Sequence, residues 1–249
     1  MTHPVCNQCA AHALTGATTC AAHLQDASAF AAGAIAVLRK DGGHLHVYSG
    51  VNWRQVDLSN LKLEHIDFSG ADLSGANFDD ADLSRANFRL AKLVGTSFVN
   101  AQLQVANLQD ADLTLANMRG ARLEGTYLSG SKLVDANLDG ARLVGANLRR
   151  TFLTRASFRG AELFRASITG AHVEGADFRG AHLRELGAMD VLGLESIVVD
   201  ATTTFVESLT GSSPNLSPGK VRGPKPSTFV WRKAPMEGDP PPTPPPIVP

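Results

Sequence analysis

The chain has 249 residues, a formal net charge of −1 and charged side chains at 19% of its positions. A balance this close to neutral excludes the basic composition of general nucleic-acid-binding proteins, so we expect no direct binding to nucleic acid. The longest small and apolar run, 27–38, is too short to span a bilayer. No basic region followed by an apolar one begins the chain, so we predict no signal peptide, no membrane association and a cytoplasmic location.

The N-terminal segment, residues 1–25, contains two close pairs of metal-ligand residues. The pairs are Cys6 with Cys9 and Cys20 with His23. Two such pairs joined by a short loop suit tetrahedral Zn²⁺, because each pair supplies two ligands and the loop brings the pairs together. His12 is an alternative ligand, and a Cys6–Cys9 redox pair or free thiols are the other interpretations. We therefore predict a structural zinc segment whose complete Cys3His shell leaves no position for catalysis.

Residues 26–50 are predicted to cover one end of the main domain with a helix and a strand. The helix is expected over 24–40, because Phe30, Ala34 and Leu38 recur every four residues and two glycines follow at 42 and 43. Residues 44–48 alternate in the manner of a strand. A cap is needed here because the open edge of a β-structure invites pairing with other chains.

Residues 51–185 divide, without an insertion, into 27 blocks of five such as ADLSG, ANFDD and ADLSR. The third position of every block is apolar, with seventeen Leu and six Phe among the 27, and nineteen first positions are Ala. A period of five matches neither a helix nor a strand, so the backbone is expected to turn once per block. Such self-similarity is typical of a repeat architecture whose units bury their apolar side by stacking.

A second period of twenty residues indicates that four blocks make one coil. The second positions Asp72, Lys92, Asp112 and Lys132 alternate in sign every twenty residues, and stacking at about 4.8 Å would place opposite charges together. With these motifs the chain resembles the pentapeptide-repeat family, whose A(D/N)Lxx blocks wind into a right-handed four-sided β-helix. The resemblance implies an all-β solenoid of about seven coils, with first and third positions pointing inward.

After Glu185 the five-residue pattern breaks. A helix over 186–197 and strand residues at 198–199 and 202–205 are predicted to form a C-terminal cap, 186–210. The oligomeric state stays open, with a homodimer through this cap as one alternative.

The remaining residues, 211–249, are predicted to form a disordered tail with polyproline II character, since twelve of the thirteen prolines lie between 214 and 249. The proline run 240–246 is either a ligand for a proline-reading module or simply a solvated segment. The apolar cluster 228–233 is a candidate to dock back onto the coil.

The sequence contains no nucleophile elbow, phosphate loop or dinucleotide fingerprint. His172 and His182 lack a predicted carboxylate or thiol partner, so surface histidines are the favoured interpretation. We therefore predict a non-enzymatic scaffold that binds a protein partner through its outer faces. Candidate binding residues are exposed aromatics with neighbouring arginines. They are Arg149, Arg150, Phe152, Arg155, Phe164 and Arg165.

The charges of the repeat are divided unevenly and suggest an alternative function. Residues 51–115 contain nine acidic and five basic side chains, a net of −4, and residues 116–185 contain seven and eleven, a net of +4. Some pentapeptide-repeat proteins imitate duplex DNA and bind DNA gyrase or topoisomerase IV, protecting these enzymes from poisons. The resemblance therefore implies a type II topoisomerase as an alternative partner, recognised through acidic residues. The candidates are Asp67, Asp72, Asp79, Asp80 and Asp82.

Overall fold

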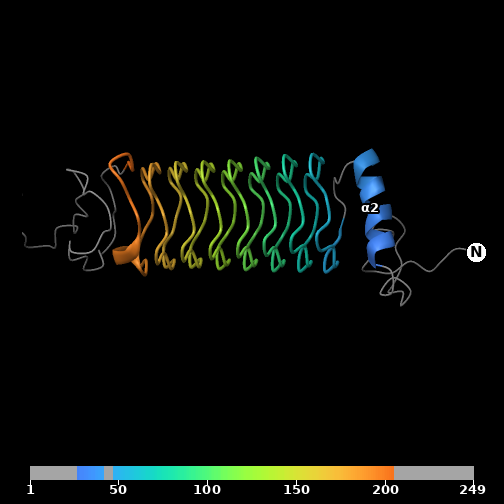
Figure 1. Ribbon diagram of the computed structural model, residues 1–249, viewed down its shortest axis with the longest axis horizontal. Coiled ribbons are helices and arrows are strands. Elements are labelled where there is room, and N and C mark those ends of the chain that lie inside the picture. The colour runs from blue at the N-terminus through green and yellow to red at the C-terminus, as the bar shows by residue number, and fades with distance from the viewer. Residues whose placement is uncertain (1–26, 42–46, 205–249) are drawn as a thin grey trace, which may run out of the picture.

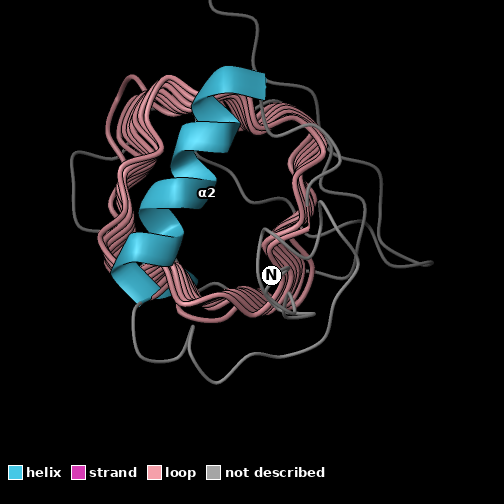
Figure 2. Ribbon diagram, turned by 90° about the vertical axis from the view of Figure 1, so that its right-hand side faces the viewer, coloured by secondary structure: helices cyan, strands magenta, loops and turns pink. Residues whose placement is uncertain are grey.

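The computed structural model describes residues 27–41 and 47–204, which form a straight rod with one helix across its N-terminal end (Figure 1). Viewed along the axis, the coil has a four-sided outline and its successive turns superimpose (Figure 2). The four-sided β-helix predicted from the sequence is therefore present.

Parallel β-bridges between residues twenty apart hold the coil together over most of its length. They run in four columns of eight residues, which define the four faces of the rod. Face 1 runs from 47 to 187, face 2 from 52 to 192, face 3 from 57 to 198 and face 4 from 62 to 204. Consecutive blocks occupy consecutive faces, so face 1 opposes face 3 and face 2 opposes face 4. The rod has eight coil levels, one more than the sequence predicted.

Each block bonds to the coil on either side through its backbone. The N–H of Asp72 donates to the carbonyl of Val51 in the preceding coil, at 2.8 Å, and the N–H of Leu73 donates to Lys92 in the next, also at 2.8 Å. The pattern repeats along the rod. These bonds satisfy the polar backbone groups on either side of the inward-facing residues, as burial requires.

A tight turn ends every block and explains the period of five. The carbonyl of Phe68 accepts the N–H of Ala71 at 3.1 Å, and Gly70 between them has a φ of 65°. Positive φ at the third residue of a turn, with the second residue in its ordinary range, is typical of type II geometry. The fifth position is left-handed in regular blocks throughout the rod, whether it holds Gly or another residue.

The core consists of the first and third positions, as predicted. Phe68, Phe78, Phe88 and Phe98 are fully buried. Rings on one face stack, with 5.2 Å between the centroids of Phe78 and Phe98, and rings from opposing faces meet edge to face, with 5.7 Å between Phe78 and Phe88. Such aromatic pairs contribute about 0.5–1.5 kcal/mol beyond the burial of their area.

The N-terminal end is covered by α2, Ala27–Asp41, which matches the predicted helix over its described residues. Its Ala34 and Leu38 are buried against the first coil, and the helix lies across the end of the coil in Figure 2. The repeat begins one block earlier than predicted, since Val47 already pairs with Asp67 and Tyr48 fills an inward position. None of the described helices is long and apolar enough to cross a membrane.

The C-terminal end differs from the prediction, because the coil continues to Thr204 and the expected helix over 186–197 is wrong. Its helical part is η2, Leu194–Ser196. The bridge residues 192, 198 and 204 are six apart instead of five, so two blocks contain one extra residue each. Gly193, at a φ of 81°, lets the chain bulge so that Leu194 is buried. A Cβ on Gly193 would come within 2.7 Å of the backbone nitrogen of Glu174, so the bulge requires glycine.

Candidate interaction surfaces

The second position of a block faces outward and also stabilises the turn. The carboxylate of Asp67 accepts the N–H of Ser69 at 2.9 Å, and the amide oxygen of Asn77 accepts the N–H of Asp79 at 3.0 Å. This contact explains the preference for Asp and Asn, whose short side chains bond to the backbone two residues on. The residues that make it are Asp57, Asp67, Asp72, Asn77, Asp82, Asn87, Asn107, Asp112, Asn117, Asn137, Asn147 and Asp177.

The predicted charge ladder on face 2 is confirmed. Asp72, Lys92, Asp112 and Lys132 pair in register, and the Lys132 ammonium lies 3.6 Å from the Asp112 carboxylate. Burial alone would raise the pKa of Asp112, but hydrogen bonds from Thr114 and the charge of Lys132 hold that pKa below its usual value. Exposed pairs contribute at most about 1 kcal/mol each, so the ladder adds little to the stability of the rod.

The five acidic candidates do not share a face. Asp67 lies on face 1, Asp72 on face 2 and Asp82 on face 4, while Asp79 and Asp80 occupy the turn that ends a block of face 3. Asp79 also accepts the Ser97 hydroxyl and the Val99 N–H across one coil. The negative charge therefore winds round the N-terminal half of the rod, and most of these carboxylates also maintain the coil.

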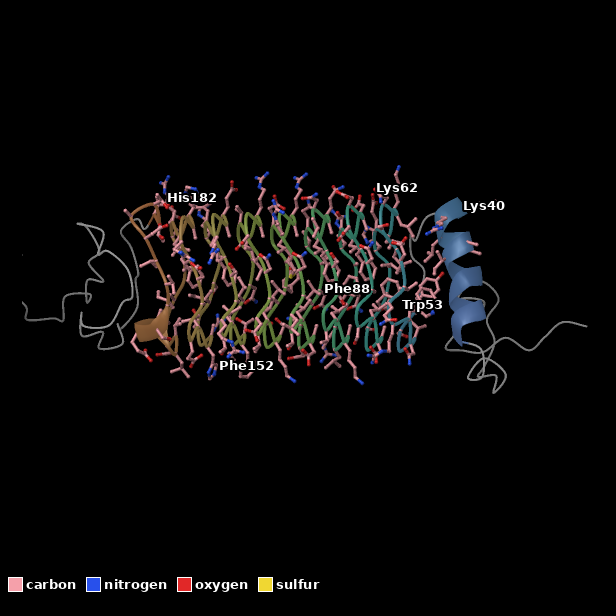
Figure 3. The ribbon with its side chains drawn as sticks, in the orientation of Figure 1. Lys40, Trp53, Lys62, Phe88, Phe152 and His182 are labelled. Carbon is pink, nitrogen blue, oxygen red and sulfur yellow. The ribbon has the colours of Figure 1, made fainter. Side chains whose placement is uncertain are left out.

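The aromatic candidates for a partner site are likewise separated. Phe152 is the bridge residue of face 2, whereas Phe164 belongs to a block of face 4, on the opposite side. Figure 3 shows Phe152 on one side of the rod, and Lys62 and His182 of face 4 on the other. The prediction that both rings form one patch is therefore wrong, because the sequence does not reveal which blocks share a side until the coil is closed.

Two of the candidate arginines are paired within the rod. Arg155 forms two hydrogen bonds to Asp135, at 2.7 and 2.6 Å, and Arg165 bonds to Glu185 at 2.7 Å. The guanidinium of Arg165 also lies 4.9 Å from the centre of the Phe164 ring. These contacts give Phe164, Arg155 and Arg165 structural roles in the described part of the chain.

The remaining candidates gather with one residue that the sequence did not single out. Tyr127, a bridge residue of face 1, is 46% exposed, and Phe152 on the neighbouring face is 41% exposed. Arg149 and Arg150 occupy the exposed turn between these faces, one coil level above Tyr127. We call Tyr127, Arg149, Arg150 and Phe152 the tyrosine–arginine patch. Tyr127 was recognisable from its position, since it is an aromatic residue at a second position.

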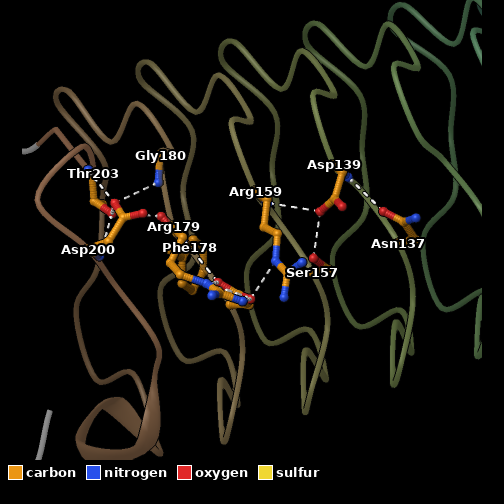
Figure 4. Close-up of polar contacts among 10 residues, drawn as sticks. Asn137, Asp139, Ser157, Arg159, Phe178, Arg179, Gly180, Asp200 and Thr203 are labelled. Atoms are coloured by element: carbon orange, nitrogen blue, oxygen red, sulfur yellow. Dashed lines mark hydrogen bonds and ion pairs between the residues drawn. The ribbon is translucent and has the colours of Figure 1, made fainter. Parts of the chain in front are cut away.

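A polar network on face 3 connects the last four coil levels (Figure 4). Asp177 accepts hydrogen bonds from Arg159 and Arg179, at 2.7 and 2.6 Å. Burial would raise the pKa of Asp177, but these hydrogen bonds keep the pKa below its usual value. Asp200 accepts the Thr202 hydroxyl at 2.7 Å and the Gly180 N–H at 3.1 Å. These bonds, that from Thr202 foremost, lower the pKa of Asp200 to about 2.

The predicted zinc ligands Cys6, Cys9, Cys20 and His23 lie outside the described residues. Within residues 27–41 and 47–204, no group of three or more His, Cys, Asp or Glu side chains is arranged to hold a metal ion. His172 stacks on Phe152, with 5.0 Å between ring centroids, and its Nδ1 is 3.8 Å from Glu174. The stacking of His172 on Phe152 is a surface contact between neighbouring coils.

The structure resembles solved structures of similar architecture. A trypsin-treated variant of QnrB1, a plasmid-mediated fluoroquinolone resistance protein, is 20% identical and aligns with 63% of this chain and 78% of its own length, at a TM-score of 0.53. HetL, a pentapeptide-repeat protein involved in heterocyst differentiation regulation in the cyanobacterium Nostoc sp. strain PCC 7120, is 24% identical over 67% of this chain and 96% of its own, at a TM-score of 0.41. At such identities, the likeness to QnrB1 concerns the fold alone.

The sequence matches family models over most of the coil. A pentapeptide repeat region model matches residues 61–138, and a model of eight pentapeptide repeats matches residues 121–160 and 161–186. No curated protein sequence matches the chain. The matched residues are those whose turns, bridges and inward side chains build the right-handed β-helix. The chain therefore belongs to the pentapeptide-repeat family.

Proposed function

We propose that this protein is a non-enzymatic scaffold that binds a protein partner through the tyrosine–arginine patch. The observation that carries the proposal is the exposure of Tyr127 and Phe152 on adjacent faces, with Arg149 and Arg150 between them. Tyrosine and arginine are enriched among the residues that dominate binding energies, and rigid side chains lose little entropy when they are ordered.

The coil supplies the rigidity that such a site needs. Neighbouring residues Asn107 and Asn147, directly below and above Tyr127 on face 1, each bond to the backbone of their own turn. Arg149 and Arg150 form no ion pair with another described residue, in contrast to Arg155 and Arg165. Their guanidinium groups therefore remain available for carboxylates of a partner, with the bidentate geometry that arginine favours.

The test compares full-length chains on a solid support. Proteins retained by the wild type are identified and purified, and their affinity is measured for the wild type and for the double variant Tyr127→Ala, Phe152→Ala. We expect the double variant to lose at least about tenfold in affinity. The matched control is Leu115→Ala, which removes another exposed apolar side chain, at 60% exposure, from the coil. An equal loss in the control, or no loss in the double variant, would contradict the proposed site.

A second candidate function is binding to a type II topoisomerase by imitation of DNA. The observation that favours it is an acidic stretch on face 3, where blocks 56–60, 76–80 and 96–100 contain three Asp and no Lys or Arg. Asp79 and Asp80 are adjacent at its edge, although Asp57 lies 3.7 Å from the Arg39 guanidinium of α2. A DNA-binding surface is positively charged, so exposed carboxylates here would be complementary to it.

Purified gyrase tests this second function. On this hypothesis the protein inhibits supercoiling at high dose and relieves a gyrase poison at low dose. Both effects weaken with added salt, since screening acts over about 10 Å at 0.1 M. Asp79→Asn with Asp80→Asn removes two charges and keeps the side-chain shapes, so both effects should decrease, while Asp110→Asn on face 1 serves as the control. If the wild-type protein shows neither effect across the dose range, the topoisomerase function is contradicted and the scaffold function is the one that stands.

A further inference from the structure

The two ends of the rod are closed differently. At the N-terminal end, Ala34 and Leu38 of α2 complete the core. At the C-terminal end, the last coil level, residues 186–204, bridges to the preceding coil, and no described residue packs on its outer side. We call residues 186–204 the C-terminal edge.

The C-terminal edge has backbone donors without a partner among residues 27–41 and 47–204. In the regular coil, the N–H of a third-position residue donates to the next coil, as Leu73 does to Lys92. The corresponding donors of the edge, the N–H groups of Ala188 and Val199, bond to no described residue. A row of such groups is a template for another chain segment.

Apolar and acidic side chains are exposed on the same edge. Leu192 is 51% exposed and Met189 is 40% exposed. Residues 186–204 contain three acidic side chains and no Lys, Arg or His. The acidic residues are Asp190, Glu195 and Asp200. A segment that covers this edge should therefore be basic and carry large apolar side chains.

The chain itself contains a segment of this composition. Residues 220–233 include five basic residues, no acidic residue, and the two aromatics Phe229 and Trp231. The coil ends at Thr204, and the fifteen residues 205–219 between them reach about 50 Å when extended. One face of the coil, five residues long, is about 16 Å wide by the same measure, so the segment reaches every part of the edge.

We propose that residues 220–233 dock on the C-terminal edge of the same chain. Phe229 and Trp231 cover Leu192 and Met189, and the basic side chains lie beside Asp190 and Glu195. Tethering by a short linker gives the segment an effective concentration in the millimolar range, which favours it over a second copy of the chain. The segment thereby closes the edge and keeps rods from stacking end to end.

Hydrogen exchange on the full chain tests the docking. The amide protons of Ala188 and Val199 should be protected in the wild type. In the variant Phe229→Ser, Trp231→Ser they should exchange at least about tenfold faster, while central amides stay unchanged. The variant leaves the coil intact, because both substitutions lie outside residues 27–204. Ile247→Ser with Val248→Ser, which alters apolar tail residues outside the segment, is the control and should have no effect.

Two further measurements separate this occupant from others. Glu195→Gln and added salt should each speed exchange at the edge, because the basic side chains of the segment lie beside Glu195. Exchange that neither of them changes would contradict this placement. Protection that disappears on about hundredfold dilution, together with a dimer-to-monomer shift in sedimentation, would show that a second copy covers the edge and would overturn the proposal. Equal exchange in the wild type and the Phe229→Ser, Trp231→Ser variant would also overturn it.

Discussion

At the scale of single residues, the coil imposes its geometry on whichever side chain occupies a position. The fifth position is left-handed in all regular blocks, and it accepts Gly70 and Asn100 without strain. It also holds Val105, at a φ of 58°, where a β-branched side chain crowds the backbone. The summed bridges and core contacts of adjacent coils therefore override local preference at such residues.

Relief of this strain is testable at Val105, which is 46% exposed. Val105→Asn should raise the free energy of unfolding by about 0.5–1 kcal/mol, because Asn tolerates the left-handed region. Urea denaturation measures the change. Gly125→Val, which places valine in the same conformation one coil later, should lower stability. A lower unfolding midpoint for Val105→Asn would mean that its side-chain contacts outweigh the strain.

The inward first position has room for alanine and little more. Ala141 is fully buried, whereas Val144 in the same block is half-buried on the outer surface. Ala141→Leu should destabilise by about 1–3 kcal/mol through overpacking, and Val144→Ala should change stability by less than about 1 kcal/mol. Equal midpoints for the two variants in thermal unfolding would contradict the assignment of inside and outside.

At the scale of elements, the blocks are alike but the two ends are specialised. Large first positions such as Val51 and Ile66 fill the core at the N-terminal end, where α2 covers it. At the other end, η2 and the carboxylate of Asp200 shape the two longer blocks. The two ends thus depart from the repeat in different ways: α2 packs on the first coil, whereas the last coil contains the two longer blocks.

The Asp200 contacts predict a dependence of stability on pH. A pKa lowered from 3.8 to about 2 in the folded state means that Asp200 stabilises the fold above about pH 4, and that this contribution is lost as the pH falls towards 2. Asp200→Asn should therefore lower the melting temperature at pH 7, and the difference from wild type should shrink between about pH 4 and pH 2. Asp190→Asn, an exposed acid of the same coil level, is the control. A difference that stays constant with pH would show that the charge of Asp200 is not involved.

The zinc segment stays a prediction at this scale. We expect one Zn²⁺ per chain, with Cys6→Ser or His23→Ala releasing most of the metal, because a tetrahedral site that loses one of four ligands binds far more weakly. Elemental analysis of the purified protein measures the metal. His12→Ala tests the alternative ligand. Much less than one zinc per wild-type chain would exclude the site.

At the scale of the whole molecule, the rod is a one-dimensional stack in which each coil contacts its neighbours. Among the described residues, one hydrophobic cluster extends from Ala34 to Val199, and successive coils keep the same cross-section (Figure 2). Stability in such arrays is approximately a sum over repeats and their interfaces. The number of residues that can be removed with all four columns of bridges kept in register is therefore twenty, not five.

Deletion of one complete coil tests this unit. Removal of residues 121–140 joins Gly120 to Ala141 with all faces in register, so the protein should fold cooperatively and be shorter by about 4.8 Å. Circular dichroism and small-angle scattering measure the fold and the length. Removal of residues 121–123 breaks the period of five and should abolish cooperative unfolding. Equal behaviour of the two deletions would contradict a core organised by blocks.

The sequence alone determined the coil, because a block of five encodes its own turn and its own inward residues. Leu143 and Ala141 could be assigned to the core, and the Asp72–Lys92 pairing to a ladder, from spacing alone. The helix over residues 27–41 was also recognisable, since its apolar residues recur with helical spacing.

Only the tertiary structure decided which residues share a side and how the rod ends. Phe152 and Phe164 are twelve residues apart in the sequence, yet the turns between them place the rings on opposite faces, whereas Tyr127 and Arg149 become neighbours. The final coil was missed because Ala188 and Gly193 replace the expected large third position, and two blocks have an extra residue. Both the placement of side chains on the faces and the course of the last coil depend on contacts between coils. These contacts hold irregular blocks in register even where the sequence no longer follows the five-residue pattern.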